Sequence, residues 1–248
     1  MKLDDIRKLH QKRYRDEFGH FLVEGEHPIL ELQKAALRNP QLRSCELYVT
    51  PEWQNWRSLF ATHVIGAAQM AQIADTKTPQ GIVAVVPVLS PSPPRSGERA
   101  VYLHEIQDPG NLGTILRTLA WFGNLRCLLS PASVDPYNSK VVRASMGAIF
   151  HVPIEVDVQL RTLRERFERI AALDMAGETP SSPAFRQYDC YLFGNEARGL
   201  PHDELTHLDA RSFTIAGCGD IESLNLASAV NMCVYELNRG VTRSGTEP

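Results

Sequence analysis

The 248-residue sequence lacks a long hydrophobic run, and it lacks an excess of positive charge. No apolar stretch approaches the roughly 18 residues that a membrane-spanning helix needs, so we expect no membrane association. Residues 1–20 are charged and have no apolar centre of the kind found in secretory signals. These absences predict a cytoplasmic protein.

Cysteine is scarce and scattered. No C-x-x-C pair occurs among the five cysteines, which are Cys45, Cys127, Cys190, Cys218 and Cys233. This spacing supports neither a zinc site nor a disulfide framework, so no metal is expected. Four of the five lie in or beside apolar runs, which predicts reduced, structural cysteines.

The formal net charge of −3 excludes a protein that coats nucleic acid over its whole surface, but it allows a local basic patch. Residues 1–20 contain six Lys or Arg against four acids, with Tyr14 and Phe18 among them. Basic residues interleaved with aromatics suit contact with phosphates and unstacked bases, and Lys12, Arg13 and Arg15 are the candidate RNA contacts. On composition alone, a solvated amphipathic helix is an equally good interpretation.

The composition predicts two domains. Residues 1–88 alternate short helix-like and strand-like pieces, which predicts a small α/β domain. Residues 89–99 are a linker, because the surrounding PVLSPSPPRSGER has four prolines, three serines and one glycine. Residues 100–242 alternate strands with helices, one of them expected over 161–173, and predict a parallel sheet covered by helices. Residues 243–248 are a tail.

The stretch VYLHEIQDPGNLGTILRTLAWFG reads as a strand, a tight turn and a helix that Asn111 is placed to cap. Leu112, Ile115 and the leucines that follow form one apolar stripe, and Arg117 points about 140° away from Leu112. A solvent-facing arginine is the ordinary interpretation of Arg117. A turn that brings backbone N–H groups beside a cation also suits an anionic ligand.

Two further segments carry weaker signals. DPYNSKVVRASMGAIFHVP places Lys140 and Arg143 on one helix face, where they can hold phosphates. FTIAGCGDIESLNLASAVNMCVYELNR joins a strand to a long helix through a glycine-rich loop. Gly217 and Gly219 resemble a dinucleotide loop only superficially, because a third glycine in register is missing, and a nicotinamide-dependent oxidoreductase is rejected.

The segment YLFGNEARGL is a short buried strand that Gly194 ends. Gly194 and Gly199 permit positive φ angles and a close approach between backbones or by a ligand. Glu196 is either an acid–base group or a carboxylate that accepts hydrogen bonds from nearby N–H groups.

Together these segments resemble the SpoU (TrmH) family of RNA ribose 2′-O-methyltransferases, members of the SPOUT class. Three motifs match in order: QDPGNLGTILRTLAWFG, LFGNEARGL and IAGCGDIESLNLASAV. DPYNSKVVRASMGAIFHVP is also similar to the family, and KRYRDEFGHFLVEGEHPI resembles its L30e-like substrate-binding domain. The resemblance covers nearly the whole chain.

The resemblance implies an α/β protein whose C-terminal parallel sheet has helices on both faces and a deep trefoil knot, and which forms a homodimer. It implies a catalytic set of Arg117, Asn111, Glu196, Ser223 and Asn225. It implies that S-adenosylmethionine is the cofactor, and the candidate residues that bind it are Gly194, Ile215, Leu224, Asn195 and Gly199. Two departures from the family pattern stand out: His104-Glu105 replaces a pair that commonly contains Asp, which we expect to matter little, and Ala216-Gly217 replaces a frequent Pro-Met in the cofactor loop.

The expected substrate is a ribose 2′-OH in structured RNA. An L30e-like domain reads structured RNA and favours 23S-type rRNA over tRNA. A tRNA 2′-O-methyltransferase and a non-catalytic RNA-binding assembly factor with the same fold are the alternatives. A protein that only bound RNA would have no need of the intact Asn111, Arg117, Glu196 and Asn225.

Overall fold

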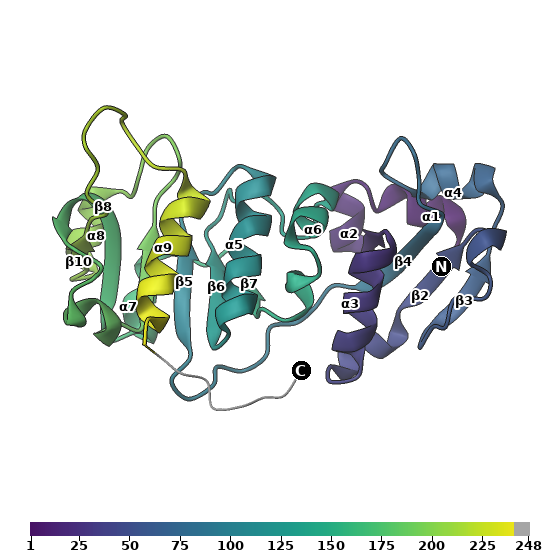
Figure 1. Ribbon diagram of the computed structural model, residues 1–248, viewed down its shortest axis with the longest axis horizontal. Coiled ribbons are helices and arrows are strands. Elements are labelled where there is room, and N and C mark those ends of the chain that lie inside the picture. Colours follow the sequence, from purple (N-terminus) through teal and green to yellow (C-terminus); the bar gives the residue numbers. More distant parts are fainter. Residues whose placement is uncertain (241–248) are drawn as a thin grey trace. The chain divides into compact units, whose positions relative to one another are not determined.

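The computed structural model describes residues 1–240, so the expected domain end at 242 and the tail at 243–248 lie outside the described residues. Contacts divide the chain into two compact units (Figure 1). Unit 1 comprises Met1–Ser92, Asp108–Arg117 and Val134–Val152. Among the described residues, unit 2 comprises Pro93–Gln107, Thr118–Ser133 and residues 153–240. Two segments beyond the proline-rich stretch therefore pack with the N-terminal part of the chain.

Unit 1 contains a four-stranded sheet in the order β1-β4-β2-β3, in which only β2 and β3 pair in parallel. Its strands are β1 (His20–Glu24), β2 (Glu46–Val49), β3 (Ala61–Val64) and β4 (Ile82–Pro87). Its helices are α1 (Leu3–Lys8), α2 (Lys12–Phe18), α3 (Glu26–Ala36), α4 (Ala67–Ile73) and α6 (Ser139–Ser145). The small α/β domain is confirmed, but β3 was not predicted, because this edge strand has four exposed residues and no apolar alternation.

One part of the core of unit 1 lies between its sheet and helices α1 and α4. Ile6 of α1 and Ile73 of α4 are fully buried against Val83 and Val85 of β4. Strand β4 is buried over Ile82–Val86 and rich in β-branched residues, which pack well on a pleated surface.

Unit 2 contains a six-stranded sheet in the order β10-β8-β9-β5-β6-β7, and all of its pairings are parallel. Its strands are β5 (Arg99–Leu103), β6 (Leu125–Leu129), β7 (Ile154–Glu155), β8 (Ile170–Glu178), β9 (Cys190–Phe193) and β10 (Arg211–Phe213). Its helices are α7 (Leu163–Arg166), α8 (His202–His207), α9 (Leu226–Asn238) and the last turns of α5 (Pro109–Phe122). The expected parallel α/β sheet is confirmed.

The prediction of one helix over 161–173 is wrong. Helix α7 occupies only Leu163–Arg166, and Ile170–Glu178 is strand β8. The sequence of this strand, IAALDMAGE, consists largely of residues with high helix propensity. Pairing with both β9 and β10 in the interior of the sheet overrides that local preference.

The strand order of unit 2 predicts where a ligand would bind along the edge of its sheet. From β5 the chain moves outward through β6 to β7, and it then crosses to β8 on the other side, with β9 between β8 and β5. In open parallel sheets, ligands bind at the carboxyl ends of the strands where the direction of winding reverses. That point lies between β5 and β9.

The cysteine prediction holds in the structure. All five thiols are free, and only Cys218 is exposed. Burial raises the pKa of Cys45, Cys127 and Cys233 to about 12, which keeps these thiols protonated and unreactive. Within residues 1–240, no helix is long and apolar enough to cross a membrane.

Candidate functional site

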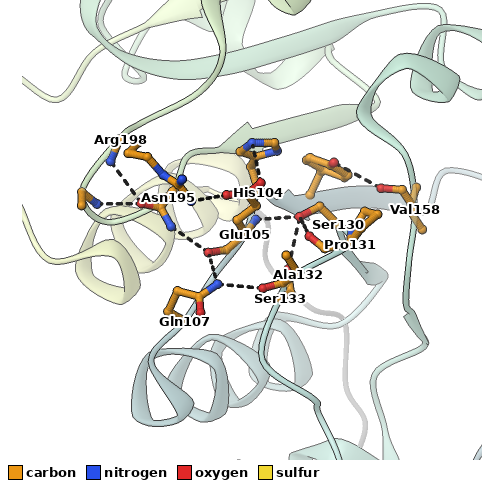
Figure 2. A network of polar contacts seen from close by, with 12 residues as sticks. His104, Glu105, Gln107, Ser130, Pro131, Ala132, Ser133, Val158, Asn195 and Arg198 are labelled. Carbon is orange, nitrogen blue, oxygen red and sulfur yellow. Dashed lines mark hydrogen bonds and ion pairs between the residues drawn. The ribbon is translucent and has the colours of Figure 1, made fainter.

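A network of hydrogen bonds joins the loops that follow β5, β6 and β9 (Figure 2). The Glu105 N–H donates to Ser130 Oγ at 2.6 Å, which ties the end of β5 to the end of β6. The Glu105 carbonyl accepts from Asn195 Nδ2 at 2.8 Å and from Gln107 Nε2 at 3.0 Å. Gln107 Nε2 also donates to the Ala132 carbonyl at 2.7 Å. The backbone of Glu105 therefore holds three loops together at the carboxyl edge of the sheet.

Glu105 adopts a left-handed backbone conformation with a φ of 49°. A side chain in this conformation costs roughly 1–2 kcal/mol, and such strain collects at functional sites. The Glu105 carboxylate forms an ion pair with Arg198 in the loop after β9. The His104-Glu105 departure was expected to matter little, yet Glu105 lies at the centre of the network.

The loop after β9 is a tight turn built on Asn195, Gly194 and Gly199. Asn195 and Gly199 exchange backbone hydrogen bonds of 3.0 and 2.9 Å. The Asn195 Oδ1 accepts from the N–H groups of Ala197 and Arg198 at 3.0 and 3.1 Å. A Cβ on Gly194 would lie 2.3 Å from the Gly199 carbonyl carbon, and Gly199 itself has a φ of 68°. Both glycines thus have the roles that the sequence predicted: close approach at Gly194 and positive φ at Gly199.

Glu196 stands exposed on this turn, and its Oε2 accepts from the Gln107 N–H at 3.4 Å. The observed contact corresponds to the second of its two predicted roles, a carboxylate that accepts hydrogen bonds. Asn195 is only 8% exposed, and the oxygen and nitrogen of its side chain are both hydrogen-bonded within the loops. A ligand would therefore meet the backbone of Asn195 rather than its amide.

A third loop runs from β10 to α9, and all of residues 216–225 are exposed. At its start, the Thr214 N–H donates to the Glu178 carbonyl at 2.9 Å. At its end, the Asn225 Oδ1 accepts from the Ser228 N–H at 3.1 Å and caps helix α9. Ser223 and Leu224 lie on the exposed part, and Ile215 is partly buried. This loop presents backbone N–H and C=O groups that a ligand can bind.

Helix α5 carries Asn111 and Arg117, both in unit 1. Asp108 caps this helix instead of Asn111, because its Oδ1 accepts from the Asn111 N–H at 2.7 Å and Pro109 occupies the first helical position. The predicted apolar stripe, which includes Leu112, is fully buried, and Arg117 is exposed. The exposure of Arg117 agrees with its ordinary interpretation and leaves it accessible to an anion.

The basic residues near the N-terminus have different environments. Lys12 and Arg13 are exposed on α2, where the Lys12 ammonium pairs with Asp16 at 2.8 Å. Arg15 is only 5% exposed, and its Nε donates to Asp135 Oδ2 at 2.9 Å. Its guanidinium also donates to the Leu9 carbonyl at 2.8 Å. Arg15 therefore stabilises unit 1, and its burial argues against the predicted contact with RNA.

The second pair of candidate RNA contacts lies on α6. Lys140 is exposed, whereas the Arg143 guanidinium donates to Asp75 Oδ2 at 2.7 Å. Ser139 Oγ donates to the same Asp75 oxygen at 2.8 Å. Partial burial raises the pKa of Asp75, but the hydrogen bonds from Arg143 and Ser139 outweigh it and lower the pKa overall. Arg143 therefore already pairs with Asp75, and an RNA phosphate would compete with this carboxylate for its guanidinium.

The sequence marked Glu105 only as a departure from the family pattern, and it gave no role to Gln107, Ser130 or Arg198. These residues come together only because parallel strands far apart in the sequence end side by side. The left-handed backbone of Glu105 is likewise a property of the folded chain that its sequence does not show. Within the described residues, no group of three or more His, Cys, Asp or Glu side chains is arranged to hold a metal ion.

Comparisons with known proteins point to one family. The SpoU rRNA Methylase family matches residues 98–235, and the MRM3-like substrate binding domain matches residues 1–84. An uncharacterized tRNA/rRNA methyltransferase of Synechocystis is 32% identical over 94% of this chain and 89% of its own. The 23S rRNA (guanosine(2553)-2′-O)-methyltransferase RlmP of Bacillus subtilis is 29% identical over 95% of each chain. The crystal structure of an AdoMet-bound rRNA methyltransferase from Sinorhizobium meliloti is 27% identical, with a TM-score of 0.82 over 97% of this chain and 95% of that one. The chain belongs to the SpoU rRNA methylase family and is an RNA methyltransferase.

Proposed function

We propose that the protein transfers the methyl group of S-adenosylmethionine to a ribose 2′-OH in structured RNA, and that this RNA is 23S-type ribosomal RNA. The observation that carries the proposal is the joined pair of loops after β5 and β9, at the point where the winding of the sheet reverses. The similarity to RlmP along nearly the full length of both chains supports the reaction and the substrate class. A tRNA 2′-O-methyltransferase is the second candidate, supported by the broader name of the Synechocystis relative.

The cofactor suits the loops of unit 2. The turn at Gly194 and Gly199 leaves no room for a Cβ on Gly194, so the backbone itself forms its surface. Ile215 and Leu224 lie in the loop after β10, where exposed backbone groups can hold the adenine and amino acid parts. The rRNA methyltransferase from Sinorhizobium meliloti was crystallised with AdoMet. When bound, the cofactor supplies a methyl group on a positively charged sulfur.

Arg117 is proposed to bind the RNA phosphate and to stabilise the negative charge that develops on the ribose oxygen. A guanidinium stays protonated in proteins, so Arg117 acts as a cation and hydrogen-bond donor and does not accept the proton. Asn111, Glu196, Ser223 and Asn225 are proposed to organise the reacting groups. Because the reaction is an in-line displacement, much of the acceleration comes from holding the ribose 2′-oxygen in line with the methyl group and the sulfur of the cofactor.

The RNA is proposed to bind through the exposed cations of unit 1. Lys12, Arg13 and Lys140 are all exposed, and residues 1–84 match a substrate-binding domain. We include Arg143 as a weaker contact, since it also pairs with Asp75. Each such phosphate contact makes binding more sensitive to salt.

We also propose that unit 2 contains the family's trefoil knot, that it forms a homodimer and that the protein acts in the cytoplasm. Membership of the SpoU rRNA Methylase family supports the knot. Trp121 is 77% exposed, and Met232 and Tyr235 of α9 are about half exposed. Exposed apolar groups of this size suit an interface with a second copy.

The test separates methyl transfer from cofactor binding. Arg117→Ala should lower methyl transfer by about 100-fold or more, by analogy with the loss of one donor to a developing oxyanion. The affinity for S-adenosylmethionine, measured by calorimetry, should change by less than about two-fold. Arg161→Ala, which removes another exposed arginine, is the matched control. Parallel loss of transfer and cofactor affinity in Arg117→Ala would contradict the assigned role.

A further inference from the structure

We propose that Glu105 is a positioning residue whose carboxylate, through Arg198, holds the 194–200 loop in the shape that binds the cofactor. This inference rests on the proposed function, because it assumes that the loop binds S-adenosylmethionine. It assigns a role to a side chain that departs from the family pattern and to an exposed arginine at the tip of the turn.

The backbone contacts of Glu105 do not need its side chain. Its N–H bonds to Ser130 and its carbonyl bonds to Asn195 and Gln107, and a glycine would make all three bonds. With a φ of 49°, a glycine would also be free of strain. The side chain must therefore provide something that the backbone does not.

The Glu105 carboxylate has two cationic or potentially cationic neighbours. One oxygen accepts from Arg198 Nη2, and the other lies 4.0 Å from His104 Nε2. Arg198 is the member of this pair that belongs to the loop after β9. The carboxylate thus connects a strained position on one loop to the exposed part of another.

The loop is attached both at its base and at its tip. At its base, the buried Asn195 amide bonds to the Glu105 carbonyl at 2.8 Å. At its tip, Glu196, Ala197 and Arg198 are exposed, and the Arg198 ion pair fixes this part of the turn from the side. The tip also has the long bond from the Gln107 N–H to Glu196 at 3.4 Å and the bonds within the turn to Asn195 Oδ1. Loss of the ion pair would therefore loosen the tip without opening the turn, while the base stays in place.

The expected effect is modest and sensitive to salt. The Arg198 side chain is 72% exposed and that of Glu105 is 30% exposed, so solvent screens their attraction. An ion pair of this kind supports a change of about two- to five-fold in cofactor affinity. The difference between variant and wild type should shrink at high salt, because the Debye length falls to about 3 Å at 1 M.

The experiment compares Glu105→Gly and Arg198→Gln with the wild-type protein. Glu105→Gly should keep or raise the thermal midpoint because it relieves strain, and it should still weaken S-adenosylmethionine binding by about two- to five-fold. Arg198→Gln should weaken binding to the same degree. The KM for the cofactor should rise while kcat changes by less than about two-fold. A purely structural role would instead lower the thermal midpoint and kcat together.

Two variants serve as matched controls. Asp209→Gly relieves a similar left-handed conformation, with a φ of 50°, away from this network. Arg169→Gln removes an exposed ion pair with Asp189. This pair lies at the amino ends of β8 and β9, whereas the network lies at the carboxyl ends of the strands. Neither should change cofactor binding.

A charge reversal completes the test. The double variant Glu105→Arg with Arg198→Glu should recover at least half of the affinity lost in Glu105→Arg. Unchanged binding in Glu105→Gly, or no recovery in the double variant, would overturn the inference. If wild-type protein itself fails to bind S-adenosylmethionine, the proposed function is wrong. In that case the role of the ion pair is tested without cofactor, by amide hydrogen exchange of residues 196–199. Faster exchange in Glu105→Gly than in the wild-type protein would support the ion pair as a restraint on the loop, and unchanged exchange would reject it.

Discussion

Replacing Asn195 by alanine tests whether the turn after β9 is held by one buried amide. The substitution removes the bond from Nδ2 to the Glu105 carbonyl at 2.8 Å. It also removes the bonds that Oδ1 accepts from Ala197 and Arg198 at 3.0 and 3.1 Å. A net contribution of about 1 kcal/mol for each bond gives an upper value of about 3 kcal/mol.

Water reduces this value but does not cancel it. The N–H groups of Ala197 and Arg198 belong to exposed residues, which water can reach once the side chain is gone. Asn195 itself is only 8% exposed, so the Glu105 carbonyl gains water less readily. A local loss of about 1.4–2.8 kcal/mol is therefore expected, and it corresponds to a 10- to 100-fold change in the opening equilibrium.

Asn195→Asp is the matched control. It keeps an oxygen that accepts from Ala197 and Arg198, and it replaces the donor to Glu105 by a second oxygen. The turn should stay closed in this variant, while its attachment to β5 weakens. The two substitutions together separate the bonds that close the turn from the bond that attaches the turn to Glu105.

Amide hydrogen exchange followed by mass spectrometry measures this prediction locally. Exchange is preferred to global unfolding because a chain with two compact units need not unfold in one step. The amides of residues 196–199 should exchange 10- to 100-fold faster in Asn195→Ala than in the wild-type protein. Exchange within two-fold of wild type would refute the assignment of the turn's stability to this side chain.

Three further predictions concern packing and charge. Gly194→Ala should displace the turn and weaken cofactor binding at least ten-fold in calorimetry, because its Cβ would lie 2.3 Å from the Gly199 backbone; unchanged affinity would disprove the tight approach. Asp135→Asn should lower the free energy of opening of unit 1 by about 3–5 kcal/mol in amide hydrogen exchange, since it leaves the buried Arg15 without its counter-charge; a loss below 1 kcal/mol would count against this. The lowered pKa of Asp75 adds stability that is complete above about pH 4 and is lost as the pH falls through the folded-state pKa; Arg143→Gln should weaken this pH dependence in thermal melts, although Ser139 still donates to Asp75, and an unaltered profile would exclude the Arg143 pair as a source.

The sequence predicted those parts of the site that depend on local pattern. The apolar stripe of α5 and the exposure of Arg117 follow from helical periodicity. The roles of Gly194 and Gly199 follow from the one property that distinguishes glycine, the missing side chain.

The rest depends on contacts between distant segments. Strand β8 looks helical by composition and becomes a strand only by pairing with its neighbours in the sheet. Arg15 looks like an exposed basic residue until Asp135, 120 residues later, is seen beside it. Glu105 acquires its role because β5, β6 and β9 end together, and no pattern within one segment reveals that arrangement.

The central claim is methyl transfer to a ribose 2′-OH of ribosomal RNA. The most direct measurement incubates the protein with methyl-labelled S-adenosylmethionine and with separated rRNA and tRNA from cells that lack it, and then maps the labelled nucleotide. The proposal predicts label on one ribose 2′-oxygen of 23S-type rRNA, and none in the Arg117→Ala reaction. Label in tRNA alone, label on a base, or no transfer to any RNA would contradict it.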